Sequence, residues 1–424
     1  MVPEWGEITL MIEQPNPSAL SEQVENMIEW LASHGGDESG GVTRLLYDPA
    51  WIAAQRAIKE KMEKIRLSAR YDDVGNLFGR VAGRDPEARV ILTGSHIDTV
   101  KGGGKYDGAY GIVAALIAVE YLLTHYGLPL KPIEVVSLCE EEGSRFPMTY
   151  WGSGNITGVK SRKKVRDIKD ANAVPFEQAM RDAGFGFGQH PQPERRDLEC
   201  FIELHIEQGQ VLEREGKSIG VVSHIVGQRR YDITVRGESN HAGTTPMHWR
   251  HDAMFTAAEL IRLLTHRAKA DESGLVATVG RMDVKPNVGN VIAREVTFSL
   301  DVRHSDAERI RLFCEECFGE FDKIAAEHGT DVVCRKWMDE SPVAMDSVLS
   351  ATAEDILKQK GISYKTMTSG AGHDSQVFGI YCPTALLFVP SRGGISHSPE
   401  EFTNTEDLQR GVRLLIDLLY KLAY

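Results

Sequence analysis

The chain has 424 residues, of which 42% are hydrophobic and 26% are charged, and its formal net charge is -13. This length suggests two or three globular domains, and the composition is ample for a large hydrophobic core. The net negative charge, without a block of basic residues, argues against nucleic acid or an anionic membrane as the main partner.

The N-terminal residues 1–14 contain neither a basic start nor an apolar stretch, so we expect no signal peptide there. The longest apolar run, residues 111–123, is interrupted by Glu120 and is too short to span a bilayer. Six cysteines scattered along so long a chain are too sparse for a disulfide scaffold, which favours reduced thiols and the cytoplasm. Cys314 and Cys317 share a predicted helix face with apolar residues, so we expect core cysteines rather than a redox or zinc site.

The first half of the chain alternates helix and strand patterns. The expected elements are a helix opened by Asn16-Pro17, a helix over 48–65, a hairpin over 70–83, a strand at 90–93, a helix over 112–124 and a strand at 133–138. The last of these is a nearly continuous apolar run, which is typical of a central strand covered on both faces. Strand, helix and strand in this order imply a right-handed crossover and a parallel or mixed sheet.

The pattern changes near residue 223. Residues 231–236 and 296–303 alternate apolar and polar side chains, which indicates an antiparallel sheet with one face in water. Two helices are expected beside it, one of them capped by Asp252 and the other running from 306 to 327. We therefore predict an α/β fold of two domains: a catalytic domain of 1–222 and 336–424, with a mixed sheet flanked by helices, and an inserted α+β domain of 223–335.

A glycine-rich loop separates the strand at 90–93 from the helix at 112–124. It carries His96, Asp98 and Asp107. Potential metal ligands at the end of a strand, in a loop that a rigid sheet positions, are typical of a functional site. On its own, the loop fits an ordinary strand-to-helix connection equally well.

Three consecutive glutamates, Glu140, Glu141 and Glu142, follow the predicted central strand. Neighbouring carboxylates at the end of a buried strand raise each other's pKa, and a cation would relieve their repulsion. If one of them binds a metal, its neighbour is placed to act as a general base.

Three further histidines lie in polar segments at or near strand ends: His205, His241 and His397. A single histidine of this kind is more often structural. Taken together, a set of imidazoles and carboxylates offers ligands suited to Zn²⁺ or a similar metal, and five of them suit two metals bridged by one carboxylate. The set consists of His96, Asp107, Glu142, His205 and His397.

The segments SHIDT, KYDG, EEEGSRF, ELHIEQG, SNHAGTTPM, DVRH, SGAGHDSQ and GISHSP resemble the M20-type metal-dependent amidohydrolases, and among them the branch that hydrolyses carbamoyl amides. The resemblance runs from about Gly41 to the C-terminus. It implies two divalent metal ions per subunit, Zn²⁺ or Mn²⁺ or also Co²⁺, held by the five residues just named, with Asp107 as the bridge. It further implies Glu141 as the general base and Asp98 as a residue that positions this base or orients His96. The triple glutamate also admits Glu140 and Glu141 as base and ligand, but the glycine after Glu142 favours Glu141 and Glu142.

The resemblance also implies roles for the inserted domain, as a lid and as the interface of a homodimer. His241 would reach the substrate from the partner subunit, and Asn290 and Arg303 would bind the substrate carboxylate. Gln208 and Arg230 are expected to be further substrate contacts.

Within the branch, the segments 41–47, 140–147 and 225–231 are similar to those of members that act on allantoate. We therefore expect hydrolysis of a ureido C–N bond of allantoate, which would give ureidoglycine, ammonia and CO₂ in purine catabolism. In this mechanism Glu141 deprotonates a water that attacks the ureido carbonyl and then returns the proton to the leaving nitrogen.

Three alternatives remain at this point. An N-carbamoyl-L-amino acid hydrolase or ureidopropionase would use the same chemistry. A di-metal aminopeptidase or dipeptidase is disfavoured by the segments HIEQG and GQRR. A binding or scaffold protein with an inactive site is disfavoured because all five ligands and the candidate base are present.

Overall fold

The computed structural model describes residues 13, 15–160 and 165–424, and most of the segment in which we expected no signal peptide lies outside them. The chain divides into two compact units. The first consists of Met1–Ser223, Met345–Met367 and Gly372–Tyr424, and the second of His224–Ala344 and Thr368–Ala371. The expected end of the inserted segment, at 335, falls inside a strand that pairs along almost its whole length within the second unit.

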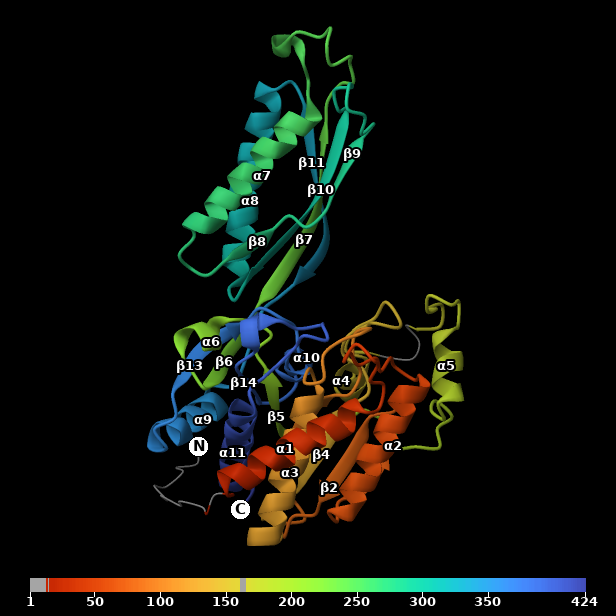
Figure 1. The fold of residues 1–424 in the computed structure, drawn as a ribbon, viewed down its shortest axis with the longest axis vertical. Coiled ribbons are helices and arrows are strands. Elements are labelled where there is room, and N and C mark those ends of the chain that lie inside the picture. Colours follow the sequence, from red (N-terminus) through yellow and green to blue (C-terminus); the bar gives the residue numbers. More distant parts are fainter. Residues whose placement is uncertain (1–12, 14, 161–164) are drawn as a thin grey trace. The chain divides into compact units, whose positions relative to one another are not determined.

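The first unit is built on a mixed sheet with the strand order β1-β2-β4-β3-β5-β14-β6-β12, and β13 pairs with β6 (Figure 1). β3 runs parallel to β4 and β5, and β14 runs parallel to β5, as the strand–helix–strand pattern predicted. The mixed α/β fold is thus confirmed. The strands of this sheet are β1 (Ser68–Tyr71), β2 (Leu77–Val81), β3 (Val90–His96), β4 (Ile133–Leu138), β5 (Leu198–Ile206), β6 (Ile219–Ile225), β12 (Val343–Ala344), β13 (Tyr364–Ser369) and β14 (Thr384–Val389). β12 and the end of β6 that pairs with it fall within the bounds of the second unit.

Helices cover both faces of this sheet. They are α1 (Pro17–Ala32), α2 (Pro49–Lys64), α3 (Ala109–Tyr126), α4 (Trp151–Ile156), α5 (Phe176–Asp182), α6 (Val211–Glu215), α9 (Ser347–Gln359), α10 (Asp374–Phe378) and α11 (Thr405–Ala423), with the short 3₁₀ turn η3 (Arg392–Gly394). Asn16 and Asp48 cap α1 and α2 by accepting hydrogen bonds from backbone N–H groups of the first turn.

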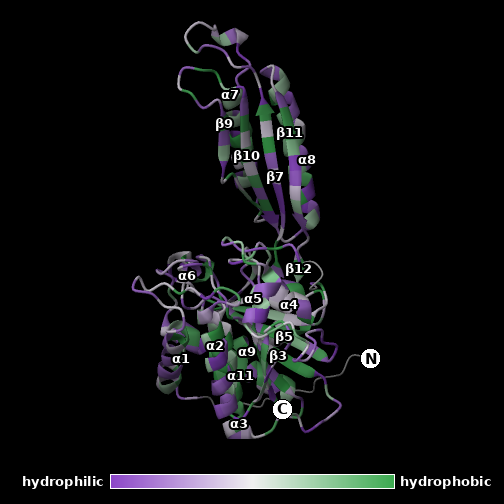
Figure 2. Ribbon diagram, turned by 90° about the vertical axis from the view of Figure 1, so that its right-hand side faces the viewer, coloured by the Kyte–Doolittle hydropathy of each residue, from purple (hydrophilic) through white to green (hydrophobic). Residues whose placement is uncertain are grey.

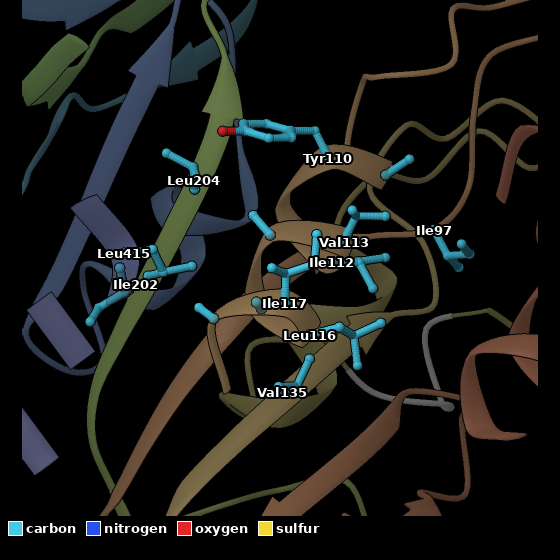
Figure 3. Packing of buried hydrophobic residues seen from close by; sticks show 14 of the residues in the cluster. Ile97, Tyr110, Ile112, Val113, Leu116, Ile117, Val135, Ile202, Leu204 and Leu415 are labelled. Atoms are coloured by element: carbon cyan, nitrogen blue, oxygen red, sulfur yellow. The ribbon is translucent and has the colours of Figure 1, made fainter. Parts of the chain in front are cut away.

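The central helix α3 packs in the core between the sheet and neighbouring helices. Figure 3 shows Leu116 and Ile117 of this helix beside Val135 of β4, with Leu204 of β5 and Leu415 of α11 nearby. Among the described helices, α3 is long and apolar enough to cross a membrane by length and composition. Its burial on nearly all sides explains this composition, because a helix covered all round by protein needs apolar residues on every face.

The second unit is an antiparallel sheet with two helices on one face. Its strand order is β11-β7-β10-β8, and β9 also pairs with β10. The strands are β7 (Gly227–Arg236), β8 (Val276–Thr278), β9 (Met282–Lys285), β10 (Glu295–His304) and β11 (Asp331–Glu340), and the helices are α7 (Ala253–Ala270), α8 (Ala307–Glu327) and the turn η2 (Met247–Trp249). Hydrophobic and hydrophilic residues alternate along β10 (Figure 2), because only the helix-facing side is buried.

Two detailed expectations for this unit are confirmed. Asp252 caps α7 by accepting hydrogen bonds from the N–H groups of Met254 and Phe255. Cys314 and Cys317 of α8 are buried in the core of the unit.

Candidate metal centre

The sheet of the first unit brings the predicted ligands of that unit to one edge. β3, β4, β5 and β14 are neighbouring parallel strands or share parallel partners, so their carboxyl ends lie at the same edge. His96 is the last residue of β3, and His205 is the penultimate residue of β5. Glu142 follows β4, and His397 follows β14. Strand order thus brings His96 and His397, about 300 positions apart in the sequence, to the same edge of the sheet.

Asp107 lies at the centre of this cluster. Its Oδ1 is 3.4 Å from Nε2 of His96 and 3.2 Å from Nε2 of His205. Its Oδ2 is 3.2 Å from Nε2 of His397, which in turn lies 3.5 Å from Oε1 of Glu142. One carboxylate oxygen therefore faces one pair of ligands, and the other oxygen faces the other pair.

The ligand atoms form two groups that share Asp107. His96, Asp107 and His205 offer ligand atoms within 4.8 Å of one another, and so do Asp107, Glu142 and His397. Imidazole nitrogens and carboxylate oxygens are donors that Zn²⁺ and related divalent metals accept. The donor chemistry and the shared carboxylate thus fit a pair of divalent cations.

The backbone orients two of the imidazoles. Nδ1 of His96 is 3.0 Å from the carbonyl oxygen of Asp98, and Nδ1 of His205 is 2.9 Å from the carbonyl oxygen of Ile206. If Nδ1–H donates to these carbonyls, Nε2 of each ring is left as the metal-binding atom, and Nε2 is the atom directed at Asp107.

The three glutamates have different environments. The Glu140 carboxylate accepts hydrogen bonds from the backbone N–H groups of Gly143 and Trp151, the latter at 3.0 Å. These bonds stabilise the loop that follows β4. Asp98 accepts from the N–H of Glu141 at 2.9 Å and of Glu142 at 3.1 Å. These bonds fix the backbone of Glu141 and Glu142, and Oε1 of Glu142 lies 3.5 Å from Nε2 of His397.

The electrostatics of the cluster favour the uptake of cations. Burial raises the pKa of Glu141 well above its usual value and that of Glu142 to about 7. The hydrogen bond to Asp107 raises the pKa of His397 to about 9. Burial would raise the pKa of Asp107, but hydrogen bonds from the three histidines keep it well below its usual value. Because a metal ion binds the deprotonated forms of these groups, its binding would displace protons from them.

Gln208, expected as a substrate contact, also lies in this cluster. Its Nε2 donates to Oδ2 of Asp107 at 2.9 Å and lies 3.4 Å from Nε2 of His397. The backbone φ of Gln208 is +56°, an uncommon left-handed value that turns the chain after β5 toward the site.

Sequence reasoning missed two residues beneath His205. The ring of His373 lies 4.5 Å from that of His205, and Glu203, His205 and His373 form a third group of closely spaced ligand atoms. Glu203 accepts hydrogen bonds from the hydroxyls of Ser95 and Ser375 at 2.7 and 2.6 Å. Glu203 and His373 lie in the segments ELHIEQG and SGAGHDSQ that carry the resemblance, but neither segment alone indicates that these two side chains meet beside His205.

The remaining predicted residues belong to the second unit, at two opposite ends of its sheet. Near one end, His241 pairs with Val291, and the carbonyl of Asn290 accepts from the N–H of Ala242 at 3.0 Å. At the other end, Arg303 and Arg230 both bind Asp301, at 2.9 and 3.0 Å. The strand from Glu295 to Arg303 spans about 26 Å at about 3.3 Å per residue. One chain therefore cannot present Asn290 and Arg303 to the same carboxylate.

Comparison with known proteins agrees with this geometry. The family described as Peptidase family M20/M25/M40 matches residues 92–421. The chain is 48% identical to an allantoate amidohydrolase of Bacillus subtilis (strain 168), over 96% of this chain and 98% of the relative. It is 45% identical to an allantoate amidohydrolase of Escherichia coli (strain K12), over 95% and 98% of the two chains.

A solved structure extends this similarity to the fold. The crystal structure of an amidase of the hydantoinase/carbamoylase family from Burkholderia multivorans matches with a TM-score of 0.90 and 33% identity, covering 94% of this chain and 97% of that one. The family match covers the glycine-rich loop, the glutamates and all the histidines of the metal centre. The chain belongs to peptidase family M20/M25/M40, whose members include metal-dependent hydrolases.

Proposed function

We propose that this chain is an amidohydrolase that cleaves a ureido C–N bond of allantoate, giving ureidoglycine, ammonia and CO₂ in purine catabolism. The observation that carries the proposal is the pair of ligand groups sharing Asp107, with Glu141 on the loop that supplies Glu142. The nearly full-length similarity to allantoate amidohydrolases supports the choice of substrate.

Two divalent metal ions would be held by this centre. His96 and His205 would bind one of them and Glu142 and His397 the other, and Asp107 would bind both. When bound, such ions polarise a carbonyl and lower the pKa of water. Zn²⁺, Mn²⁺ and Co²⁺ all accept this donor set, so availability and geometry would decide among them.

Glu141 would be the general base. Burial raises the pKa of Glu141, which makes its carboxylate a stronger base than an exposed glutamate, and the hydrogen bond that Asp98 accepts from its N–H fixes the loop on which it stands. Glu141 would remove a proton from the water that attacks the ureido carbonyl and then deliver that proton to the leaving nitrogen. Asp98 would act by holding Glu141 and Glu142 in place and by lying next to His96, with its Oδ1 3.4 Å from Nδ1 of that ring.

Substrate binding would involve both units and a second copy of the chain. Arg303 would bind the substrate carboxylate with its guanidinium group, and Arg230 and Gln208 would contact other polar groups. Since Asn290 and His241 lie at the far end of the same sheet from Arg303, they would reach a given substrate from the partner subunit. This arrangement supports a homodimer in which the second unit serves as lid and interface.

The localisation we propose is the cytoplasm. All six cysteines are free thiols, and five of them are buried. A chain without disulfides suits a reducing compartment.

Ammonia release from allantoate, with N-carbamoyl-L-amino acids alongside, tests this function. The protein is stripped of metal and reconstituted with Mn²⁺ or Zn²⁺. We expect a clearly higher kcat/KM for allantoate. A preference for N-carbamoyl-L-amino acids would keep the metal centre but reject the assigned substrate, and no turnover by the fully loaded protein would reject the enzymatic function.

A further inference from the structure

A buried carboxylate outside the proposed ligand set supports the loop that carries Asp107. Glu401 is only 4% exposed, and it follows His397 by four positions. Its Oε1 accepts hydrogen bonds from the backbone N–H groups of Tyr106 and Asp107, at 3.0 and 3.1 Å. The backbone of Asp107 is thus hydrogen-bonded to the side chain of Glu401, which follows the last candidate ligand in the sequence.

The second carboxylate oxygen of Glu401 is hydrogen-bonded to Ser396, on the loop that carries His397. Oε2 accepts from the hydroxyl of Ser396 at 2.7 Å, and this hydroxyl oxygen lies 3.5 Å from Oδ2 of Asp107. Gln208 donates to the same hydroxyl oxygen at 3.1 Å. Because Ser396 directly precedes His397, one carboxylate joins the loop of Asp107 to the loop of His397.

The loop is shaped to admit this carboxylate. A Cβ atom on Gly104 would lie 2.0 Å from Oε1 of Glu401 and 2.2 Å from its carboxylate carbon. Only a glycine at this position allows the close approach, since any side chain would displace the carboxylate.

We propose that Glu401 is a positioning residue of the metal centre, which holds the backbone of Asp107 and, through Ser396, the loop of His397, so that the two ligand groups converge. The proposal rests on the metal centre proposed above. Glu401 itself lies behind the ligands and acts through them. Buried N–H donors that lose their acceptor destabilise the arrangement that buries them, so without Glu401 the loop of Asp107 would move to satisfy them elsewhere.

Metal titration of Glu401→Ala tests this role. Metal-free protein is titrated with Mn²⁺ against a competing chelator, and the two binding constants are determined. Loss of a group that orients a ligand typically weakens metal binding about 10–100-fold. We expect both sites to weaken in Glu401→Ala, because Asp107 belongs to both, whereas His397→Ala should weaken only one. The matched control is Glu400→Ala, which removes the neighbouring exposed carboxylate and should change neither constant.

Two further variants separate positioning from folding and from charge. Glu401→Gln keeps an oxygen acceptor for the two N–H groups, so it should recover most of the lost affinity. Ser396→Ala removes a single half-buried hydroxyl, and it should weaken the site of His397 even if Glu401→Ala does not fold. Wild-type affinities in Glu401→Ala or in Ser396→Ala, an equal loss in Glu400→Ala, or no recovery in Glu401→Gln would each overturn the proposal.

These measurements need no substrate. Wild-type protein that binds two ions but does not hydrolyse allantoate would contradict the proposed function and leave this inference standing. Wild-type metal affinities in Glu401→Ala, together with normal allantoate turnover by the wild type, would contradict this inference and leave the proposed function standing.

Discussion

At the residue scale, two carboxylates, those of Asp107 and Asp98, hold the candidate site together. The two oxygens of Asp107 face three imidazoles, and the carboxylate of Asp98 accepts from two successive N–H groups in the glutamate loop. Neighbouring residues of one type therefore have different hydrogen-bond partners. Glu140 is occupied by backbone donors, whereas Glu141 and Glu142 remain available.

Replacement of Glu141 by Gln tests the division of roles in this loop. The amide cannot accept a proton, so we expect kcat on allantoate to fall by at least about 10²–10⁴-fold, the usual contribution of a general base. Metal content, measured by elemental analysis after gel filtration, should equal that of the wild type. Loss of metal from Glu141→Gln together with retention of metal in Glu142→Gln would mean that base and ligand are reversed.

Metal binding should release protons and strengthen as the pH rises. With pKa values raised to about 7 for Glu142 and about 9 for His397, His397 is protonated and Glu142 is partly protonated at neutral pH in the metal-free protein. Because a metal binds only the deprotonated forms, protons compete with it, and this competition decreases as the pH rises toward 9. Addition of Zn²⁺ to weakly buffered metal-free protein at pH 7 should acidify the solution. Affinity that is independent of pH between 6 and 8 would contradict these shifts.

At the scale of elements, the sheet of the first unit places the candidate ligands, and a buried ion cluster lies near the amino end of its strand β4. Glu134 of β4 is fully buried, and it accepts from Arg195 at 2.7 Å and from Arg80 at 2.9 Å. Strand β4 leads directly into the glutamate loop, so the stability of this strand bears on the site.

Removal of this buried carboxylate should be costly. Glu134→Ala would leave Arg195, itself only 8% exposed, without one of its partners, and loss of one partner of a buried pair typically costs about 3–5 kcal/mol. The control is Glu199→Ala on β5, whose carboxylate binds Lys131 at 2.7 Å near the surface and should contribute about 0–1 kcal/mol. Urea unfolding of the metal-free variants, followed by tryptophan fluorescence, measures both. Equal losses in the two variants would show that burial of Glu134 adds no stability.

At the scale of the whole molecule, the length of the strands in the second unit argues for a dimer. Asn290 precedes β10, and the strand from Glu295 to Arg303 alone spans about 26 Å at about 3.3 Å per residue, so the two residues are too far apart to share a carboxylate within one chain. In a symmetric dimer each substrate can take one of these residues from each subunit.

Mixing two inactive variants tests this arrangement. Arg303→Ala and Asn290→Ala should each be nearly inactive on allantoate. After dissociation and reassociation of a mixture, half of the dimers are mixed, and each of these has one site with both residues intact, so about a quarter of the wild-type activity should return. The same variants reassociated separately are the control. If the mixture stays inactive although mixed dimers form, both residues act within one chain. If a single variant keeps its activity, the residue that it lacks is not needed.

The sequence by itself determined the elements and the candidate ligands. Hydrophobic periodicity follows directly from which face of a helix or strand is buried, so the predicted elements lie close to the observed ones. Their ends were less predictable: β3 runs on to His96 because it pairs with β4 as far as Leu138, and α3 begins at Ala109, within the glycine-rich loop. The five candidate ligands were recognisable because polar residues at or after the ends of apolar strands stand out along the chain.

The tertiary structure alone decided which atoms meet. Strand order, which no local pattern encodes, brings residues 96, 107, 142, 205 and 397 to one edge, and it directs the two oxygens of Asp107 to different partners. The fold also places Glu401 beside the backbone of Asp107, and the extended strand β10 separates Asn290 from Arg303. The contacts among the candidate ligands and with Glu401 join segments that are distant in sequence. Such contacts depend on the packing of the whole chain rather than on any one segment.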